Sequence, residues 1–305
     1  MLRVGRAVGT VCAAVAITAA GTGVAQAAPP PLPNVLLQLP ALPPIPGLPT
    51  PAPGVDLQKS FSQLSKKITK TIPGRLGVAV VATGSGEPLF FGTVKSARAW
   101  STLKAPVAVA AERRHVTNLG AMENKAIRDS DNASAEQIWD SLGSTQQAID
   151  AVSAVLRDGG DARTQIASEL SKPASYPGAT QWATTDQAIF GANLACVAGS
   201  DPVLRNMSRV GPNQRWGVAK GKKGVRTAVK GGWGPVSDAT GKYVVRQLAN
   251  VTTDRGTVGV SLVAIPNSGT FADGTAMLTR VGDWVQKNLK NMPAGQCPPA
   301  VPVVQ

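Results

Sequence analysis

Apolar residues recur at helical spacing at both ends of the region that begins at residue 56. The first stretch has lysines between its apolar positions, Asp56 is a suitable N-cap for it, and Pro73-Gly74 ends it. Its apolar positions are Leu57, Phe61, Leu64 and Ile68. The second stretch covers residues 274–289, and its apolar stripe consists of Met277, Leu278, Val281, Trp284, Val285 and Leu289. The pattern therefore predicts a helix at each end of this region.

Between these two helices, strand-like and helix-like stretches fall into separate blocks. Runs rich in small and branched apolar residues predict strands over residues 76–82, 89–94, 225–233, 243–253 and 257–265. The middle of the chain predicts helices over residues 101–114, 118–142, 148–157 and 184–197, with a long loop over residues 170–182. Strands from both ends must join one antiparallel sheet. We therefore expect an α+β fold with a five-stranded antiparallel sheet flanked by terminal helices, plus an all-helical subdomain. The boundary between sheet and helical subdomain is the expected place for a site.

Residues 1–27 have the pattern of an export signal. Arg3 and Arg6 precede an uncharged, apolar run, and small residues stand at the expected cleavage positions, Ala25-Gln26-Ala27. The run is too short and too rich in Ala, Gly and Thr for a membrane span. We expect a protein that is secreted or held in the cell envelope, with no transmembrane span.

Residues 28–55 differ in composition from everything that follows. Eleven prolines and no charged residue lie between residues 29 and 55. Such a segment favours extended, polyproline-like structure and is expected to be a tether, although its Leu and Val residues also suit a contact with the envelope. The expected organisation is thus a signal, this tether, a single domain over residues 56–292 and a tail over residues 293–305.

The positive net charge of the chain indicates which classes of partner to expect. Lys and Arg number 31 against 18 Asp and Glu, which gives a net charge of +13. One basic cluster consists of Lys220, Lys222, Lys223, Arg226 and Lys230. Aromatic residues make up only 4% of the chain, which argues against the stacking platforms of nucleic-acid-binding proteins. We expect no nucleic-acid partner. Anionic cell-envelope polymers and a simple solvated basic face are equally good explanations of the cluster.

Histidine and cysteine are scarce. The chain has one His and three Cys, too few ligands for a zinc finger or a multi-histidine metal centre. We therefore expect no metal and no organic cofactor. Two cysteines, Cys196 and Cys297, remain after removal of the signal. Outside the cytoplasm such a pair favours a disulfide over two free thiols, with Cα atoms within roughly 7 Å.

Three short motifs carry candidate chemistry. Ser101 and Lys104 form an S-x-x-K pattern at the start of a predicted helix, where positions i and i+3 share a face and an amine of lowered pKa can activate a hydroxyl. Ser130-Asp131-Asn132 interrupts a helical stretch with polar residues, which suggests side chains directed into a site. Lys230-Gly231-Gly232 ends a predicted strand with a cation and two glycines, typical of close approach by a ligand or another backbone. Each motif alone is weak evidence.

The order S-x-x-K, S-D-N, K-x-G resembles that of the class A β-lactamases and penicillin-binding proteins. The resemblance implies an acylated nucleophile at Ser101, with Lys104 as its base. Ser130 would pass a proton to the leaving nitrogen, and Asn132 would bind the substrate amide. Lys230 would attract a substrate carboxylate beside Gly232, and the N–H groups of Ser101 and Trp233 would form an oxyanion hole.

The same resemblance matches Glu169, in the long loop, to the glutamate that activates the deacylating water; a solvated glutamate at a helix end is the alternative. Three departures affect the chemistry. Ser101 and Ser130 are only 29 residues apart, so the helical block is trimmed. Pro173 stands where the family has an asparagine. Gly231 offers no hydroxyl to a substrate carboxylate. Arg246 on the next strand is a candidate to take over this role, and a surface arginine is an equally good interpretation of it.

The sequence thus predicts an exported serine hydrolase that acts by acyl transfer on a small lactam or a peptidoglycan-like amide. A class A-like β-lactamase is the first interpretation, and a D-alanyl peptidase is the second. The alternatives from other classes are a non-catalytic envelope-binding protein on the same fold and a scaffold module tethered by the Pro-rich segment.

Overall fold

The computed structural model describes residues 55–84, 86–167 and 177–299. The predicted signal, nearly all of the Pro-rich tether and Glu169 lie outside the described residues, so the predictions for them stay predictions.

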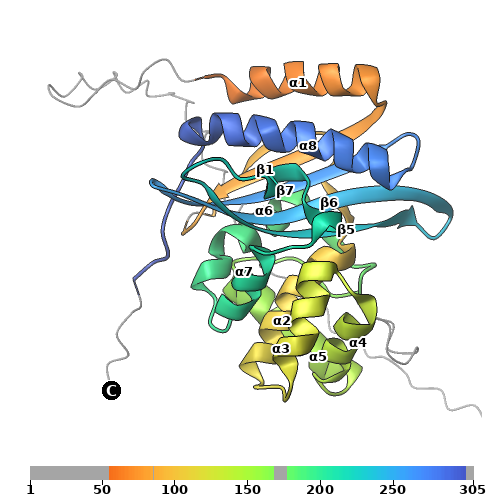
Figure 1. Cartoon of the computed structure of the whole chain (residues 1–305), viewed down its shortest axis with the longest axis vertical. Helices are drawn as coiled ribbons and strands as arrows, with labels where there is room; N and C mark the ends of the chain where they lie inside the picture. Colours follow the sequence, from red (N-terminus) through yellow and green to blue (C-terminus); the bar gives the residue numbers. More distant parts are fainter. Residues whose placement is uncertain (1–54, 85, 168–176, 300–305) are drawn as a thin grey trace, which may run out of the picture. The chain divides into compact units, whose positions relative to one another are not determined.

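A five-stranded antiparallel sheet forms the centre of the described part, as the sequence predicts (Figure 1). The strands lie in the order β2 (Leu89–Gly92), β1 (Gly74–Ala82), β7 (Gly256–Pro266), β6 (Thr240–Thr253) and β5 (Arg226–Ser237). β1 pairs with β2 on one side and with β7 on the other, so it joins the early strands of the sheet to the late ones. The early and late parts of the chain therefore meet in one open sheet, in which β2 and β5 are the edge strands.

The two terminal helices, α1 (Leu57–Thr71) and α8 (Phe271–Asn288), cover one face of the sheet (Figure 1). The Asp56 side chain caps α1 by accepting from the N–H of Lys59 at 2.9 Å. Phe61 of α1, Phe91 of β2 and Trp284 of α8 stack with ring centroids 5.2–5.6 Å apart. The apolar stripes seen in the sequence are thus the surfaces that bind both helices to the sheet.

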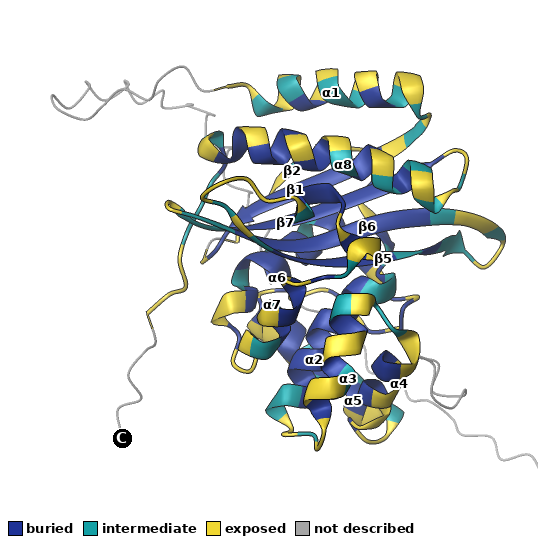
Figure 2. Ribbon diagram, viewed as in Figure 1, coloured by how far each residue is buried: buried dark blue, intermediate teal, exposed yellow. Residues whose placement is uncertain are grey.

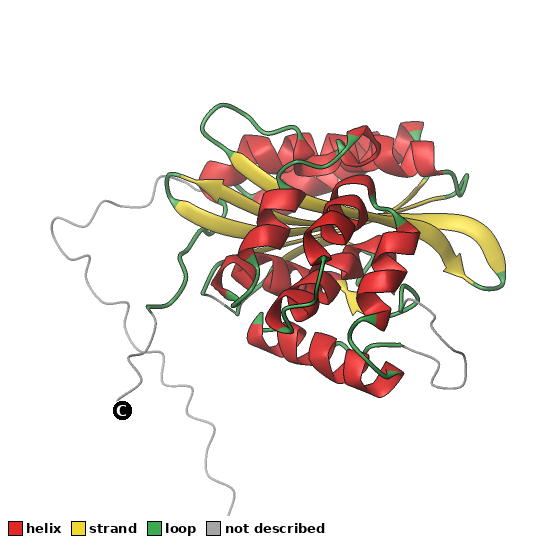
Figure 3. Cartoon of the chain, turned by 60° about the horizontal axis from the view of Figure 1, so that its bottom comes forward, coloured by secondary structure: helices red, strands yellow, loops and turns green. Residues whose placement is uncertain are grey.

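The other α-helices of the described ranges lie on the opposite side of the sheet (Figures 1 and 3). They are α2 (Lys104–Arg113), α3 (Leu119–Asn124), α4 (Asn132–Asp140), α5 (Thr145–Asp158), α6 (Thr184–Asn193) and α7 (Asp201–Met207). Helix α6 packs directly against β7, where a Cβ on Gly259 would lie 2.2 Å from Ala188 O. Only glycine allows this approach, which brings the all-helical subdomain against the sheet.

The single helix predicted over residues 118–142 is wrong. The chain there forms α3, the π-helical turn η2 (Lys125–Asp129) and α4, and Ser130 between them has a left-handed backbone with φ of 60°. Neither α7 nor the small sheet of β3 (Ser96–Arg98) and β4 (Gln181–Ala183) was expected. Such short elements carry too little periodicity to be recognised in a sequence.

Short 3-10 turns complete the described structure. They are η1 (Trp100–Leu103), η3 (Leu194–Cys196), η4 (Pro212–Gln214), η5 (Gly217–Ala219) and η6 (Leu289–Asn291). Buried residues follow the central strands, α2 and α6, while exposed residues lie on the outer faces of the peripheral helices (Figure 2). None of the helices in the described ranges combines the length and apolarity needed to cross a membrane.

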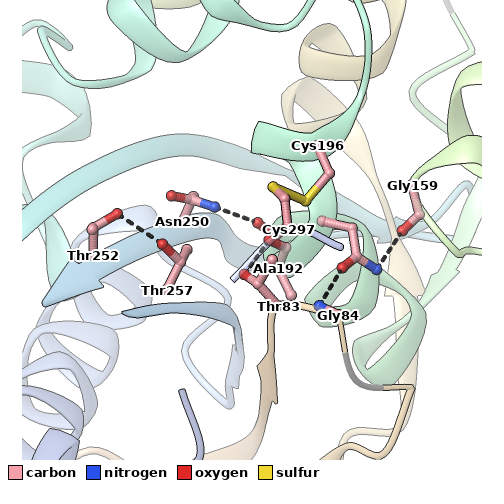
Figure 4. Close-up of a disulfide and its surroundings, with 11 residues drawn as sticks. Thr83, Gly84, Gly159, Ala192, Cys196, Asn250, Thr252, Thr257 and Cys297 are labelled. Carbon is pink, nitrogen blue, oxygen red and sulfur yellow. Dashed lines mark hydrogen bonds between the residues drawn. A yellow bond between two sulfur atoms is a disulfide. The ribbon is translucent and has the colours of Figure 1, made fainter. Parts of the chain in front are cut away.

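The predicted disulfide between Cys196 and Cys297 is present, with Cα atoms 5.4 Å apart (Figure 4). It joins the end of α6 to the C-terminal segment. Backbone hydrogen bonds from Thr257 N to Gly295 O, at 2.7 Å, and from Gly295 N to Thr257 O, at 3.1 Å, hold the same segment beside β7. The bridge encloses a sequence separation of 101 residues.

We predict that the double replacement Cys196→Ser/Cys297→Ser lowers the free energy of unfolding by roughly 4 kcal/mol, because a loop of this length restricts the unfolded chain. Urea unfolding of the oxidised protein measures the change, and the reduced wild type is the matched control. Equal midpoints for oxidised and reduced wild type would contradict a stabilising role of the bridge.

Candidate active site

Ser101 lies in the turn η1, immediately before α2, and its side chain is partly exposed. The residue before it, Trp100, has φ of 46°, a left-handed backbone that is costly for a bulky side chain. Surrounding contacts hold this conformation: Trp100 N donates to Gly178 O at 2.8 Å, and the indole Nε1 donates to Pro235 O at 3.2 Å. Its ring covers Gly234, where a Cβ would lie 2.4 Å from it. The turn that carries Ser101, called the nucleophile turn after the role expected from the sequence, is therefore anchored on both sides.

A buried glutamine supports the same turn from below. Gln187 of α6 donates from Nε2 to the hydroxyl of Thr102 at 2.9 Å, and that hydroxyl donates to Ala99 O at 2.6 Å. Gln187 Oε1 accepts from the Ser261 hydroxyl at 2.7 Å and from Arg246 Nε at 3.3 Å. These bonds connect the turn to the central strands β6 and β7.

Lys104 is 2% exposed, and its ammonium lies among oxygen atoms of the S-D-N segment. Nζ donates to Ser130 O at 2.7 Å, Asp131 O at 3.2 Å and Asn132 Oδ1 at 2.8 Å. Burial lowers the pKa of Lys104 to about 8, against the opposing effect of the Asp131 and Glu136 carboxylates. A lysine with this pKa exists partly as the free amine near neutral pH.

Ser130 owes its position to the break in the helical stretch. Its left-handed backbone directs both its carbonyl and its hydroxyl toward buried lysines. The Asp131 carboxylate caps α4 by accepting from Ser134 N at 2.7 Å, and hydrogen bonds from the side chain and then the backbone of Ser134 lower the pKa of Asp131. The polar residues that weaken the helix at this point therefore start the next helix and supply acceptors to Lys104.

The π-helical turn before Ser130 is fixed by residues of the following segments. Gln214 Nε2 donates to Ile127 O at 2.9 Å and to Arg128 O at 2.8 Å. Arg128 Nε donates to Asn206 Oδ1 at 2.6 Å, and Asn206 Nδ2 donates to the buried Glu123 carboxyl at 2.6 Å. Burial, reinforced by the neighbouring Glu112, raises the pKa of Glu123 to about 8. This network holds the turn that precedes Ser130.

Lys230 of β5 is completely buried on the other side of Ser130. Its Nζ donates to Ser130 Oγ at 2.9 Å, Gln214 Oε1 at 2.6 Å and Gly231 O at 2.9 Å. Burial is the main cause that holds the pKa of Lys230 well below its usual value, and the charge of Lys104 adds to it. Two buried lysines thus meet at one serine. Because it is buried, Lys230 does not belong to the exposed basic cluster in which the sequence analysis placed it.

The edge of β5 faces the nucleophile turn. A Cβ on Gly232 would lie 2.7 Å from Ala99 O and 2.9 Å from Thr102 N, so this glycine permits the close approach of turn and strand. The Gly231 N–H points away from the sheet, since it donates to Gln214 Oε1 at 2.9 Å. In an extended strand the N–H of residue i+2 points to the same side, and that residue is Trp233.

The structure thus brings together seven of the residues chosen from the sequence: Ser101, Lys104, Ser130, Asn132, Lys230, Gly232 and Trp233. It does not bring Arg246 to them. The guanidinium is fully buried and donates from Nη1 to Ala97 O at 2.6 Å, Arg98 O at 3.3 Å and Trp182 O at 3.2 Å. Burial lowers the pKa of Arg246 to about 9, which leaves it charged at neutral pH. Its contacts bind the segment before Ser101 to the sheet, so the suggested carboxylate-binding role does not fit its position.

Three residues that support the site were not recognised in the sequence: Trp100, Gln187 and Gln214. Each acts through a contact between distant segments, and none belongs to a motif. The only local signal was Trp100, a rare aromatic residue beside the S-x-x-K serine. In the described ranges, no three His, Cys, Asp or Glu side chains gather as metal ligands, and the two lysines make the surroundings of Ser101 unsuited to a cation.

Comparisons with known proteins were made for the sequence and for the structure. No protein-family model matches the sequence, and no curated protein matches it. Solved structures do match. A class A beta-lactamase from Mycobacterium abscessus shares 17% identity with a TM-score of 0.59, over 77% of this chain and 99% of the other.

Two further solved structures agree with this match. A representative of class A beta-lactamase from Bacteroides cellulosilyticus shares 15% identity with a TM-score of 0.61, over 76% of this chain and 98% of the other. An ancestral class A beta-lactamase shares 20% identity with a TM-score of 0.59, over 76% of this chain and 99% of the other. The chain therefore has the fold of the class A beta-lactamases, which the order of its three motifs predicts.

Proposed function

We propose that this chain is an exported serine hydrolase that transfers an acyl group from a small lactam or peptidoglycan-like amide to Ser101. The observation that carries the proposal is the meeting of Lys104 and Lys230 at Ser130, beside the partly exposed Ser101. A buried lysine is costly, and a pair of them at one serine has a direct use in moving protons. The fold of class A beta-lactamases supports the same chemistry.

Lys104 acts as the base. With its pKa lowered to about 8, roughly a tenth of the molecules carry the free amine at pH 7. The amine takes the proton of the Ser101 hydroxyl, and Ser101 Oγ forms a bond to the carbonyl carbon. Developing charge on the carbonyl oxygen is stabilised by N–H groups. The edge-facing N–H of Trp233, together with that of Ser101 at the start of the helical turn, suits this task.

Ser130 completes the transfer. Lys230 Nζ donates to Ser130 Oγ, so the O–H of Ser130 is free to donate to the leaving nitrogen. As the carbon–nitrogen bond breaks, that nitrogen takes the Ser130 proton, and the proton held on Lys104 replaces it. The result is an ester on Ser101 and an unchanged set of protons; the amine leaves when the donor is an open-chain amide and stays attached to the acyl group when the donor is a lactam. Asn132, whose Oδ1 is bound to Lys104 Nζ, retains an amide NH2 group that can donate to the substrate.

Export and the envelope belong to the same proposal. The disulfide suits an oxidising compartment, in agreement with the predicted export signal. The exposed Lys220, Lys222, Lys223 and Arg226 supply a positive face that suits anionic envelope polymers.

We predict that a fluorescent penicillin labels the mature protein on Ser101 and that Ser101→Ala abolishes the label in a folded protein, because no acyl ester can form. Peptide mapping locates the adduct. Ser96→Ala, an exposed serine of β3, is the matched control and should label like wild type. Full labelling of Ser101→Ala would exclude this nucleophile. If no acyl donor labels the wild type, the alternative interpretation as a non-catalytic envelope-binding protein is favoured.

The rate of acylation should rise with pH in the manner of a base whose pKa is about 8. From pH 6 to pH 7 we expect roughly a tenfold increase, and above pH 9 a plateau, since only the free amine of Lys104 accepts the Ser101 proton. Intact-mass spectrometry over pH 6 to 9.5 measures it. Lys104→Arg keeps the charge yet should not acylate, because a guanidinium stays protonated. A pH-independent rate would contradict the role of Lys104.

For deacylation we propose Glu169 as the group that activates water. Glu169→Gln should acylate at the wild-type rate and retain its adduct at least tenfold longer, because the amide cannot take a proton from water. The decay of the intact-mass adduct after removal of free lactam measures this lifetime, and Glu87→Gln, an exposed glutamate, is the control. Equal lifetimes in Glu169→Gln and wild type would assign the water to another group.

A further inference from the structure

The backbone at Gly231 stands where the resemblance places a hydroxyl for a substrate carboxylate. There is no room for that hydroxyl in this chain. A Cβ at this position would lie 2.8 Å from Trp216 Cζ2 and 3.3 Å from Trp233 Cζ3. Two indole rings therefore flank the glycine, and any side chain there would have to displace one of them.

Trp216 is held firmly in place. Its Nε1 donates to Asn213 O at 2.9 Å, and its carbonyl accepts from Gln247 Nε2 at 2.7 Å. Gln247 pairs with Gly231 across the two strands, and its Oε1 accepts from Val218 N at 2.9 Å. The side chain of β6 that faces Gly231 is thus a neutral amide that fixes the indole.

The two buried cations near this point bond to the protein itself. Lys230 Nζ donates to three internal acceptors, Ser130 Oγ, Gln214 Oε1 and Gly231 O. Arg246 donates to backbone carbonyls beneath the turn that carries Ser101. Because both side chains are fully buried, neither presents an exposed pair of donors to a carboxylate at Gly231.

On this side of β5, aromatic side chains lie where a carboxylate would need a cation. The rings of Trp233 and Phe271 stack with centroids 4.8 Å apart, and both are only partly buried. Phe271 also contacts Trp216, with centroids 6.3 Å apart in an edge-to-face arrangement. The three rings form an aromatic wall beside Gly231, next to the N–H of Trp233.

We propose that the subsite at Gly231 receives an uncharged, apolar part of the acyl donor, so that neutral esters and amides are preferred over carboxylate-bearing lactams. This inference rests on acyl transfer through Ser101. Desolvating a carboxylate against the aromatic wall without a cation is costly, whereas an ester group loses little there.

The test compares benzylpenicillin with its methyl ester, which differ only at this carboxylate. In both, Ser101 Oγ bonds to the lactam carbonyl carbon, the ring carbon–nitrogen bond breaks, and the nitrogen takes the proton. We expect the methyl ester to acylate at least tenfold faster by intact-mass kinetics. A free acid that reacts as fast as the ester, or faster, would overturn the inference while leaving acyl transfer intact. Failure of both compounds would overturn acyl transfer itself.

A double variant tests the role of Gly231 directly. Gly231→Thr combined with Trp216→Ala supplies the hydroxyl and removes the clashing ring, and should lower the ester-to-acid rate ratio at least tenfold. Gly241→Thr is the matched control, because a Cβ at that exposed glycine of β6 meets nothing within 4 Å; its ratio should equal that of wild type. An unchanged ratio in a folded double variant would contradict the role of Gly231. If the double variant does not fold, the wild-type comparison decides alone.

Discussion

The burial of two lysine ammonium groups around one serine is the constraint on which the rest of the site depends. Each buried N–H needs an acceptor, and Lys104 and Lys230 together take six oxygen atoms from Ser130, Asp131, Asn132, Gln214 and Gly231. A continuous helix would use the carbonyls of residues 130 and 131 in its own hydrogen bonds. The helical stretch must therefore break there, and the left-handed Ser130 is where it does.

This constraint also explains the neutral residues around the site. Gln214 connects the π-helical turn to β5, accepting from Lys230 and donating to two carbonyls, and a charged residue could not do both. Glu123 is linked to the π-helical turn by hydrogen bonds through Asn206 and Arg128, and its burial keeps its carboxyl group largely uncharged at neutral pH. Burial lowers the pKa values of both lysines, and a lowered pKa is what the proposed proton transfer from Ser101 requires.

The sequence predicted the parts that depend on local pattern. The amphipathic stripes of α1 and α8, the five strands and the order of the three motifs sufficed for the fold, and the even cysteine count sufficed for the disulfide. The break at Ser130 was visible as a polar interruption but was predicted as part of one helix. Gln187 and Gln214 were missed because each supports the site through a hydrogen bond to a residue far away in sequence, 85 residues for Gln187 and 87 residues for Gln214. Arg246 was misjudged because alternation along a strand shows which face a residue is on, and not which partner lies beneath it.

Alternate residues of strand β5 face two different parts of the site, the proposed catalytic groups and the aromatic wall. Its even positions, Lys230 and Gly232, face Ser130 and the nucleophile turn, while Gly231 and Trp233 face the aromatic rings on the side of α8. Because successive residues of a strand point to opposite faces, a change at an odd position alters what lies beside the substrate without moving the lysine that contacts Ser130. Four residues of β5 therefore contribute both to the proposed acylation machinery, through Lys230, and to the aromatic wall, through Trp233, yet the two contributions can vary independently. A chain of this fold can accordingly keep its nucleophile and proton path while it exchanges a carboxylate anchor for an apolar surface.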